Sequence, residues 1–254
     1  MRKAVGFAGI SAVATTLAFA GPASALGPVH HQTERVVVPG QVTALSVRGE
    51  VGNITVLPGS VTRIVAAEQW NFAAPTLTHT LQDGVLRVAA PCPRPTGIVD
   101  IGFNDCLVDL LITVPAAVTV DAVDSVGDIR IRDLRGNETL RSDVGEIRVD
   151  RVVGPSLTAT SDTGSVRLAG VRFAALTLRS SSGGVQADLA RMPRTVVARS
   201  SDGDVDLTVP AGTYAVDTHT DVGSTHVRGI TSSSDAPRTL SAHTDDGDIR
   251  IVGR

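Results

Sequence analysis

The sequence predicts an all-β protein folded as a single-domain, β-solenoid-like repeat of about 18–24 residues per coil. A glycine-centred motif recurs throughout the second half of the chain. On both sides of each glycine, apolar and polar residues alternate with period two, which is typical of strands with one buried face. Beyond residue 25, no stretch sustains the 3.6-residue period of an amphipathic helix.

The glycine motif reads "SDVGEIRV" or a close variant, and successive copies are separated by 18, 19, 19, 20, 20 and 24 residues. An isolated copy, "RGEVGNITV", lies upstream. Two short strands and two connections in about 20 residues match one solenoid coil, whose equivalent positions stack ~4.8 Å apart. A β-sandwich of hairpins is the alternative, since it accommodates the longer last step more easily. The motif glycines are Gly52, Gly127, Gly145, Gly164, Gly183, Gly203, Gly223 and Gly247.

Residues 1–25 have the pattern of a secretory signal peptide. Arg2 and Lys3 precede an apolar run over residues 4–20, and small residues end at Ala25. A membrane anchor is the weaker alternative, because the run is short and interrupted by Gly, Ser and Thr. We therefore expect cleavage after Ala25 and no stable membrane insertion afterwards. The predicted location is extracellular, with retention at the cell surface only through non-covalent contacts.

The remaining chain divides into three predicted parts. Residues 26–35 are expected to be a flexible leader, residues 36–123 an N-terminal β segment or cap, and residues 124–254 the β-strand repeats. Within the cap, Asp83-Gly84 between two alternating runs predicts a hairpin turn. Three bulky aromatic residues are assigned to the core of the cap rather than to a binding surface: Trp70, Phe72 and Phe103.

The two cysteines, Cys92 and Cys106, are most simply a disulfide, because an even pair in an exported chain is usually oxidised. Closing a loop of about 15 residues contributes roughly 3 kcal/mol in the chain-entropy model. The alternatives are a metal-binding pair, which lacks further His or Cys ligands nearby, and two free thiols.

Three kinds of segment are distinctive: "VRGEVGNITV", "LLITVPAAVTVDAVDSVGDIRI" and the later S-D-x-G-x-[VI] units that end at "TDDGDIRI". Together they carry a resemblance to the bacterial "putative adhesin" family of β-strand-repeat proteins, a domain of unknown function. It covers roughly residues 36–254. The resemblance implies an exported or membrane-associated β-solenoid-like domain, and it implies no catalytic residues because none is defined for the family.

Aspartates beside the motif glycines have two interpretations. As turn residues, Asp and Ser bond to nearby backbone amides while glycine supplies a positive φ, and the neighbouring Ser and Thr residues form a coil-to-coil ladder. As ligands, stacked carboxylates would bind calcium, although the G-G-x-G-x-D pattern of calcium solenoids is missing. We favour the turn. The calcium alternative rests on Asp143, Asp162, Asp221 and Asp245.

The sequence predicts no enzyme and no cofactor. It contains no G-x-S-x-G, H-E-x-x-H, Walker or dinucleotide-binding motif. Carboxylates at wet turn tips also lack the burial that raises the pKa of a general acid. Two alternatives to an adhesin-like binding or envelope scaffold domain stay open, a β-helical polysaccharide-acting enzyme and a calcium-stabilised structural domain. Acids confined to turn tips would argue against the enzyme.

Partners are constrained by charge. Without the signal peptide the chain has 21 basic and 26 acidic residues, a balance of 21 − 26 = −5, which argues against nucleic acid. An arginine-striped strand face is either solvated or a docking face for an anionic surface or wall polymer. Its outward residues after the glycines include Arg130, Arg148, Arg167, Gln186, Asp206, His226 and Arg250. The open edge of the C-terminal coil, near Ile251, predicts self-association.

Overall fold

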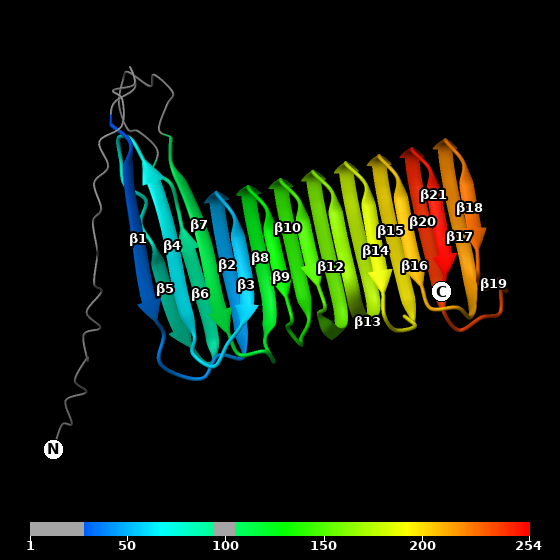
Figure 1. The fold of residues 1–254 in the computed structure, drawn as a ribbon, viewed down its shortest axis with the longest axis horizontal. Coiled ribbons are helices and arrows are strands. Elements are labelled where there is room, and N and C mark those ends of the chain that lie inside the picture. The colour runs from blue at the N-terminus through cyan, green and yellow to red at the C-terminus, as the bar shows by residue number, and fades with distance from the viewer. Residues whose placement is uncertain (1–27, 94–104) are drawn as a thin grey trace.

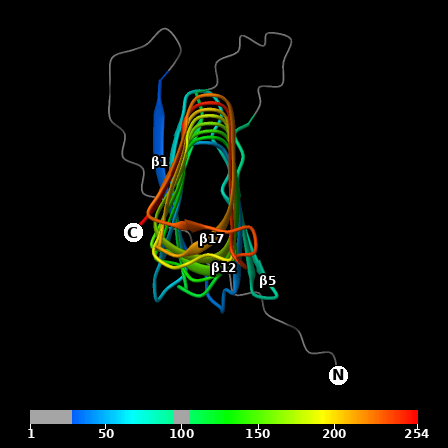
Figure 2. The same ribbon diagram turned by 90° about the vertical axis from the view of Figure 1, so that its right-hand side faces the viewer.

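The computed structural model describes residues 28–93 and 105–254, and it confirms the all-β solenoid (Figure 1). Viewed along its axis, the coils superimpose into a narrow profile of two walls joined by rounded turns (Figure 2). Strands of successive coils pair in parallel, which excludes the alternative of a hairpin sandwich. The expected signal peptide lies outside the described residues.

One wall, sheet A, carries the strands that follow the motif glycines. Along the solenoid axis its order is β1 (His30–Val37), β4 (Arg63–Trp70), β7 (Leu107–Val114), β3 (Ile54–Pro58), β9 (Ile129–Arg132), β11 (Ile147–Asp150), β13 (Val166–Ser182), β14 (Val185–Leu189), β16 (Val205–Val209), β21 (Ile249–Gly253) and β18 (Thr225–Arg228).

The other wall, sheet B, carries the strands that precede the glycines. Its order is β5 (Thr78–Gln82), β6 (Val85–Ala90), β2 (Ala44–Val51), β8 (Thr119–Val126), β10 (Glu138–Val144), β12 (Val153–Thr163), β13, β15 (Thr195–Asp202), β20 (Thr239–Asp246) and β17 (Thr213–Val222). β13 belongs to both walls, since it turns the corner at Gly170, where φ is +63°. The short β19 (Thr231–Ser232) pairs with the start of β17.

The core is a set of apolar columns between the walls. Period-two alternation points every second side chain inward, and parallel register stacks these residues coil upon coil. One column from sheet A contains Ile54, Ile129, Ile147, Val166, Val185, Val205 and Ile249, each at most 1% exposed. No coil could bury such a face alone, so neighbouring coils stabilise one another.

Two coils occupy places that differ from their order in the chain. The coil of Gly52 (β2–β3) lies between β6–β7 and β8–β9, so the isolated motif copy is in register with the rest. The last coil in sequence, β20–β21, lies between β15–β16 and β17–β18 (Figure 1). The end coil is therefore β17–β18. The prediction of an open edge at the C-terminal strand was wrong, because β21 has a neighbour on both sides.

The N-terminal end is closed by antiparallel strands. β1 pairs with β4, β4 with β7, and β5 with β6 through the predicted turn, where Asp83 and Gly84 have φ of +51° and +77°. The predicted leader is wrong for residues 30–35, since backbone pairing with β4 orders this polar segment, and His30 stacks on Trp70 at 5.6 Å.

Of the three aromatic residues assigned to the core of the cap, one is exposed and one is half-buried. Phe72 is 66% exposed and Trp70 is half-buried. The prediction was wrong for Phe72, because the residue lies two positions after the end of β4 and outside the alternating strand pattern. Phe103 lies outside the described residues. The predicted disulfide between Cys92 and Cys106 is confirmed, and it joins β6 to β7 at the place where other coils have a glycine turn.

Candidate functional site

The outward face of sheet A carries a row of long polar side chains. Since each follows its motif glycine by the same number of residues, parallel pairing places them side by side, ~4.8 Å apart. Along the axis the row is Arg130, Arg148, Arg167, Gln186, Asp206, Arg250 and His226. Arginine thus stands on both sides of two shorter residues, Gln186 and Asp206.

The arginines differ in their partners. Arg130 Nη2 lies 2.6 Å from Asp128 Oδ2, Arg148 Nε lies 3.2 Å from Asp150 Oδ2, and Arg167 pairs with Glu146. Within the described residues, Arg250 and Arg228 make no ion pair at a distance of 4.0 Å or less. Both side chains are exposed, so their guanidinium groups are available to a ligand.

The face is hollowed between these arginines. A cavity of about 530 Å³ opens above β13, β14 and β16, where the outward side chains of Ala169 and Thr208 are short. A second hollow of about 490 Å³ adjoins it near the end coil and shares Asp206. We call the combined hollow the sheet A trough and define it by six residues: Arg148, Arg167, Gln186, Asp206, Arg228 and Arg250.

Asp206 is the half-buried acid in the middle of the trough. Burial raises the pKa of its carboxyl, and the neighbouring Asp204 acts in the same direction, whereas Arg250 opposes them. Four further acids line the trough: Asp150, Asp188, Asp204 and Asp248. Asp150 pairs with Arg148, and Asp188 pairs with Arg254. Acidic groups are therefore not confined to the turn tips, so the arrangement that would argue against the enzyme is not the one observed.

The sequence matches the family model "Toastrack DUF4097" over residues 41–252. The chain belongs to this Toastrack family. The resemblance expected from the glycine motifs is confirmed by the match to this family model. No curated protein is significantly similar in sequence to this Toastrack chain.

Three solved structures are similar to this chain, and the first of them shares its fold. A putative adhesin from Bacteroides fragilis is 17% identical, with 87% of this chain and 97% of that chain covered and a TM-score of 0.55. A putative cell adhesion protein from Clostridium sporogenes is 13% identical, with 88% and 100% covered and a TM-score of 0.39. A putative lipid binding protein from Parabacteroides distasonis is 11% identical, with 88% and 95% covered and a TM-score of 0.30.

The Toastrack turn edge has the predicted glycine and serine geometry. The eight motif glycines have φ between +127° and +154°. At Gly145 a Cβ would also lie 2.0 Å from the Gly127 carbonyl oxygen. Both the positive φ and this close approach therefore exclude a side chain at Gly145. The hydroxyls of the Ser and Thr ladder donate to the glycine carbonyl of the neighbouring coil at 2.8–3.0 Å. The donors are Ser142, Ser161, Ser180, Ser200, Thr244 and Thr220.

The aspartates considered as calcium ligands lie in two separate pairs. In register their row is Asp143, Asp162, Ser181, Ser201, Asp245 and Asp221. Arg141 lies 3.1 Å from Asp143 and 2.7 Å from Asp162, and His219 lies 2.9 Å from Asp221. In the part of the chain that the structure describes, no group of three or more His, Cys, Asp or Glu residues is arranged to hold a metal ion.

Two buried acids in sheet B were missed by the sequence analysis. Asp124 occupies the ladder position of Ser142, and burial raises the pKa of its carboxyl to about 7. Glu138 is in register with Val120 and Leu157 in an apolar column, and burial raises the pKa of its carboxyl to about 8. Aligning the coils would have found both, since each acid interrupts a column that is otherwise hydroxylic or apolar.

Glu68 of β4 is a third buried acid, and its pKa is raised to about 7 by burial and by Glu34. The carboxyls of Asp124, Glu138 and Glu68 do not line the trough. Their protonation is therefore expected to affect the stability of the fold. In the described segments, no helix is long and apolar enough to cross a membrane.

Proposed function

We propose that this Toastrack chain is a secreted, non-enzymatic, adhesin-like binding or envelope scaffold domain that presents sheet A to a cell-surface or wall partner. The trough is the observation that carries the proposal, because it gathers exposed arginines around a hollow on a rigid ladder. The chain's fold also occurs in a protein named as a putative adhesin. Flat, hydrogen-bonded walls hold such a face with little loss of conformational entropy on binding.

Co-sedimentation tests the proposal. Purified protein is mixed with intact bacterial cells or with isolated cell-wall polymer, and the fraction in the pellet is measured against salt concentration. We expect the protein to pellet with the wall material and to be released by salt, since exposed charge pairs are screened. Protein that stays in the supernatant at low salt with every wall preparation would contradict the proposal.

The polysaccharide-acting enzyme is kept as a second candidate because of the acids in the trough. Asp188 and Asp206 lie on neighbouring strands, and burial raises the pKa of Asp206 in the direction that a general acid needs. Incubation with wall polymer followed by a reducing-end assay separates the two functions. Reducing ends that are released by the wild type, and lost in Asp206→Asn, would assign the enzyme.

A further inference from the structure

The charges of the trough follow a pattern along the solenoid axis. Two adjacent coils contribute Arg148 and Arg167, and the two coils at the far end contribute Arg250 and Arg228. Between them lie the coils of Gln186 and Asp206. Three ladder steps separate the inner arginines, about 14 Å at ~4.8 Å per step. The trough thus has arginines at both ends, where Asp150 and Asp248 accompany them, and the acids Asp188, Asp204 and Asp206 lie between.

The two ends suit carboxylates. A guanidinium group offers a planar fork of N–H donors that matches a carboxylate, and this fork distinguishes arginine from lysine. Arg250 and Arg228 have no competing ion pair within the described residues. Arg148 and Arg167 pair with the buried Asp150 and the half-buried Glu146, but each guanidinium group is about half exposed and keeps further N–H donors free for a ligand.

The middle of the trough suits sugar hydroxyls. Gln186 supplies an amide that both donates and accepts hydrogen bonds, and the Asp206 carboxylate accepts them. An anionic group placed here would be repelled by Asp206 and by Asp204 beside it. A ligand that follows the trough therefore needs charged groups at the ends and neutral hydroxylated groups between them.

Other classes of ligand fit the trough less well. A nucleic acid carries a charge at every unit and would set phosphates against the central acids. A neutral glycan would be expected to stack on aromatic rings, and apart from His226 the residues that line the trough are not aromatic. A peptide would need pockets for apolar anchors, whereas the apolar lining residues Leu168 and Leu207 are buried.

We infer that the trough binds an acidic polysaccharide laid along the solenoid axis, in which carboxylate-bearing sugars are separated by neutral ones. The inference rests on the proposed binding function and names the class of its partner. Carboxylates contact the arginine forks at the two ends, and the hydroxyls of the intervening neutral sugars contact Gln186 and Asp206.

Titration with three defined polymers tests the inference. Hyaluronate alternates a uronic acid with a neutral amino sugar, polygalacturonate has a carboxylate on every sugar, and dextran is neutral. We expect the purified protein to bind hyaluronate most tightly, in a salt-dependent manner. The double variant Arg167→Gln/Arg250→Gln should weaken hyaluronate binding roughly a hundredfold, because each of the two lost charge-assisted contacts costs about one decade.

The matched control is Arg179→Gln/Arg199→Gln, which removes two exposed arginines that lie in register on the opposite wall. Its hyaluronate affinity should equal that of the wild type. Equal losses in both double variants would overturn the inference, as would polygalacturonate binding as tightly as hyaluronate, or no binding of any acidic polymer. If the protein still pellets with wall material in those cases, the proposed function stands and only the ligand class is wrong.

Discussion

Replacing Glu138 by glutamine should remove a pH dependence from the stability of the fold. The carboxyl is 1% exposed, lies between Val120 and Leu157, and has no hydrogen-bond partner within the described residues. Burial raises its pKa from 4.5 to about 8, so the folded protein keeps the proton over a range in which the unfolded chain has released it.

The sign follows from this difference in proton binding. Between pH 4.5 and 8 the folded state binds more protons than the unfolded state, so stability falls as the pH rises. The contribution is fully present below pH 4.5 and is lost by pH 8. A shift from 4.5 to about 8 corresponds to about 5 kcal/mol at 1.36 kcal/mol per pH unit. Burial is the sole cause of the pKa shift of Glu138, so the shift does not depend on the charge of another acid. The titration of the other acids should therefore contribute equally to the wild type and the variant and cancel in the comparison.

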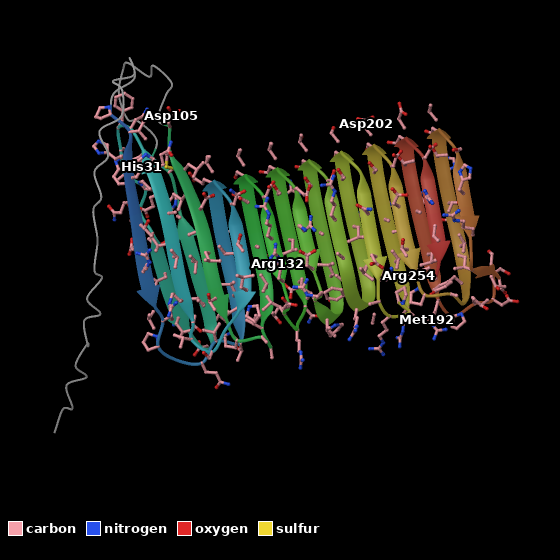
Figure 3. All side chains as sticks on the ribbon, in the orientation of Figure 1. His31, Asp105, Arg132, Met192, Asp202 and Arg254 are labelled. Carbon is pink, nitrogen blue, oxygen red and sulfur yellow. A yellow bond between two sulfur atoms is a disulfide. The ribbon has the colours of Figure 1, made fainter. Side chains whose placement is uncertain are left out.

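Urea unfolding at pH 4 and at pH 9 measures the effect. The wild type should lose on the order of 5 kcal/mol more than Glu138→Gln between these values, whatever the absolute stability of the variant. Asp202→Asn is the control, since Asp202 is exposed at the turn edge (Figure 3). Parallel stability curves for the wild type and Glu138→Gln would refute the reasoning, because they would mean that the buried carboxyl titrates normally.

Three further predictions follow from the turns and the end coil. Gly145→Ala should lower the free energy of unfolding by about 3 kcal/mol or more in a thermal melt. Gly170→Ala should lower it by about 1 kcal/mol, because a Cβ at Gly170 meets no atom closer than 3.7 Å. Equal losses would contradict the argument from close backbone approach at Gly145. Melts with millimolar calcium and with chelator should coincide, and a stabilisation near 2.7 kcal/mol at hundredfold excess would assign the turn aspartates as ligands. Self-association should occur through the exposed edges of β17 and β18; Val227→Lys should then lower the sedimentation-derived mass at high protein concentration, and a monomeric wild type would contradict this proposal.

The turn chemistry was predictable because it is local. A glycine with positive φ and a hydroxyl three residues before it are both visible in "SDVGEIRV", and the structure joins Ser142 to the Gly127 carbonyl at 3.0 Å. The trough was predictable in part. Equal spacing from the glycines identifies the row from Arg130 to Arg250, but the hollow depends on the short side chains of a second row.

The order of the coils was not predictable in the same way. A repeat motif shows that a segment forms a coil, but any coil with the same register can pair with any other. The 24-residue step between Gly223 and Gly247 was the visible sign, since it includes the connection that lets β20–β21 reach back beside β15–β16. Phe72 shows a further limit, because a bulky aromatic residue just after a strand need not be buried.

The displaced final coil has a consequence for the folding and persistence of the protein. Each strand of β17–β18 pairs with β20–β21 on its inner side, so the end coil cannot dock until the residues that follow it have been synthesised. During synthesis, coils can add to the solenoid in chain order only as far as β15–β16. The coils β17–β18 and β20–β21 must then fold together. Once folded, β21 is held between two neighbours, and the Arg254 amide donates to the Val209 carbonyl at 3.0 Å. Detachment of β20–β21 must therefore break the pairings with two neighbouring coils, whereas detachment of an end coil breaks the pairings with one. This arrangement slows the unfolding of β20–β21, because local opening is harder for a coil with two neighbours than for an end coil.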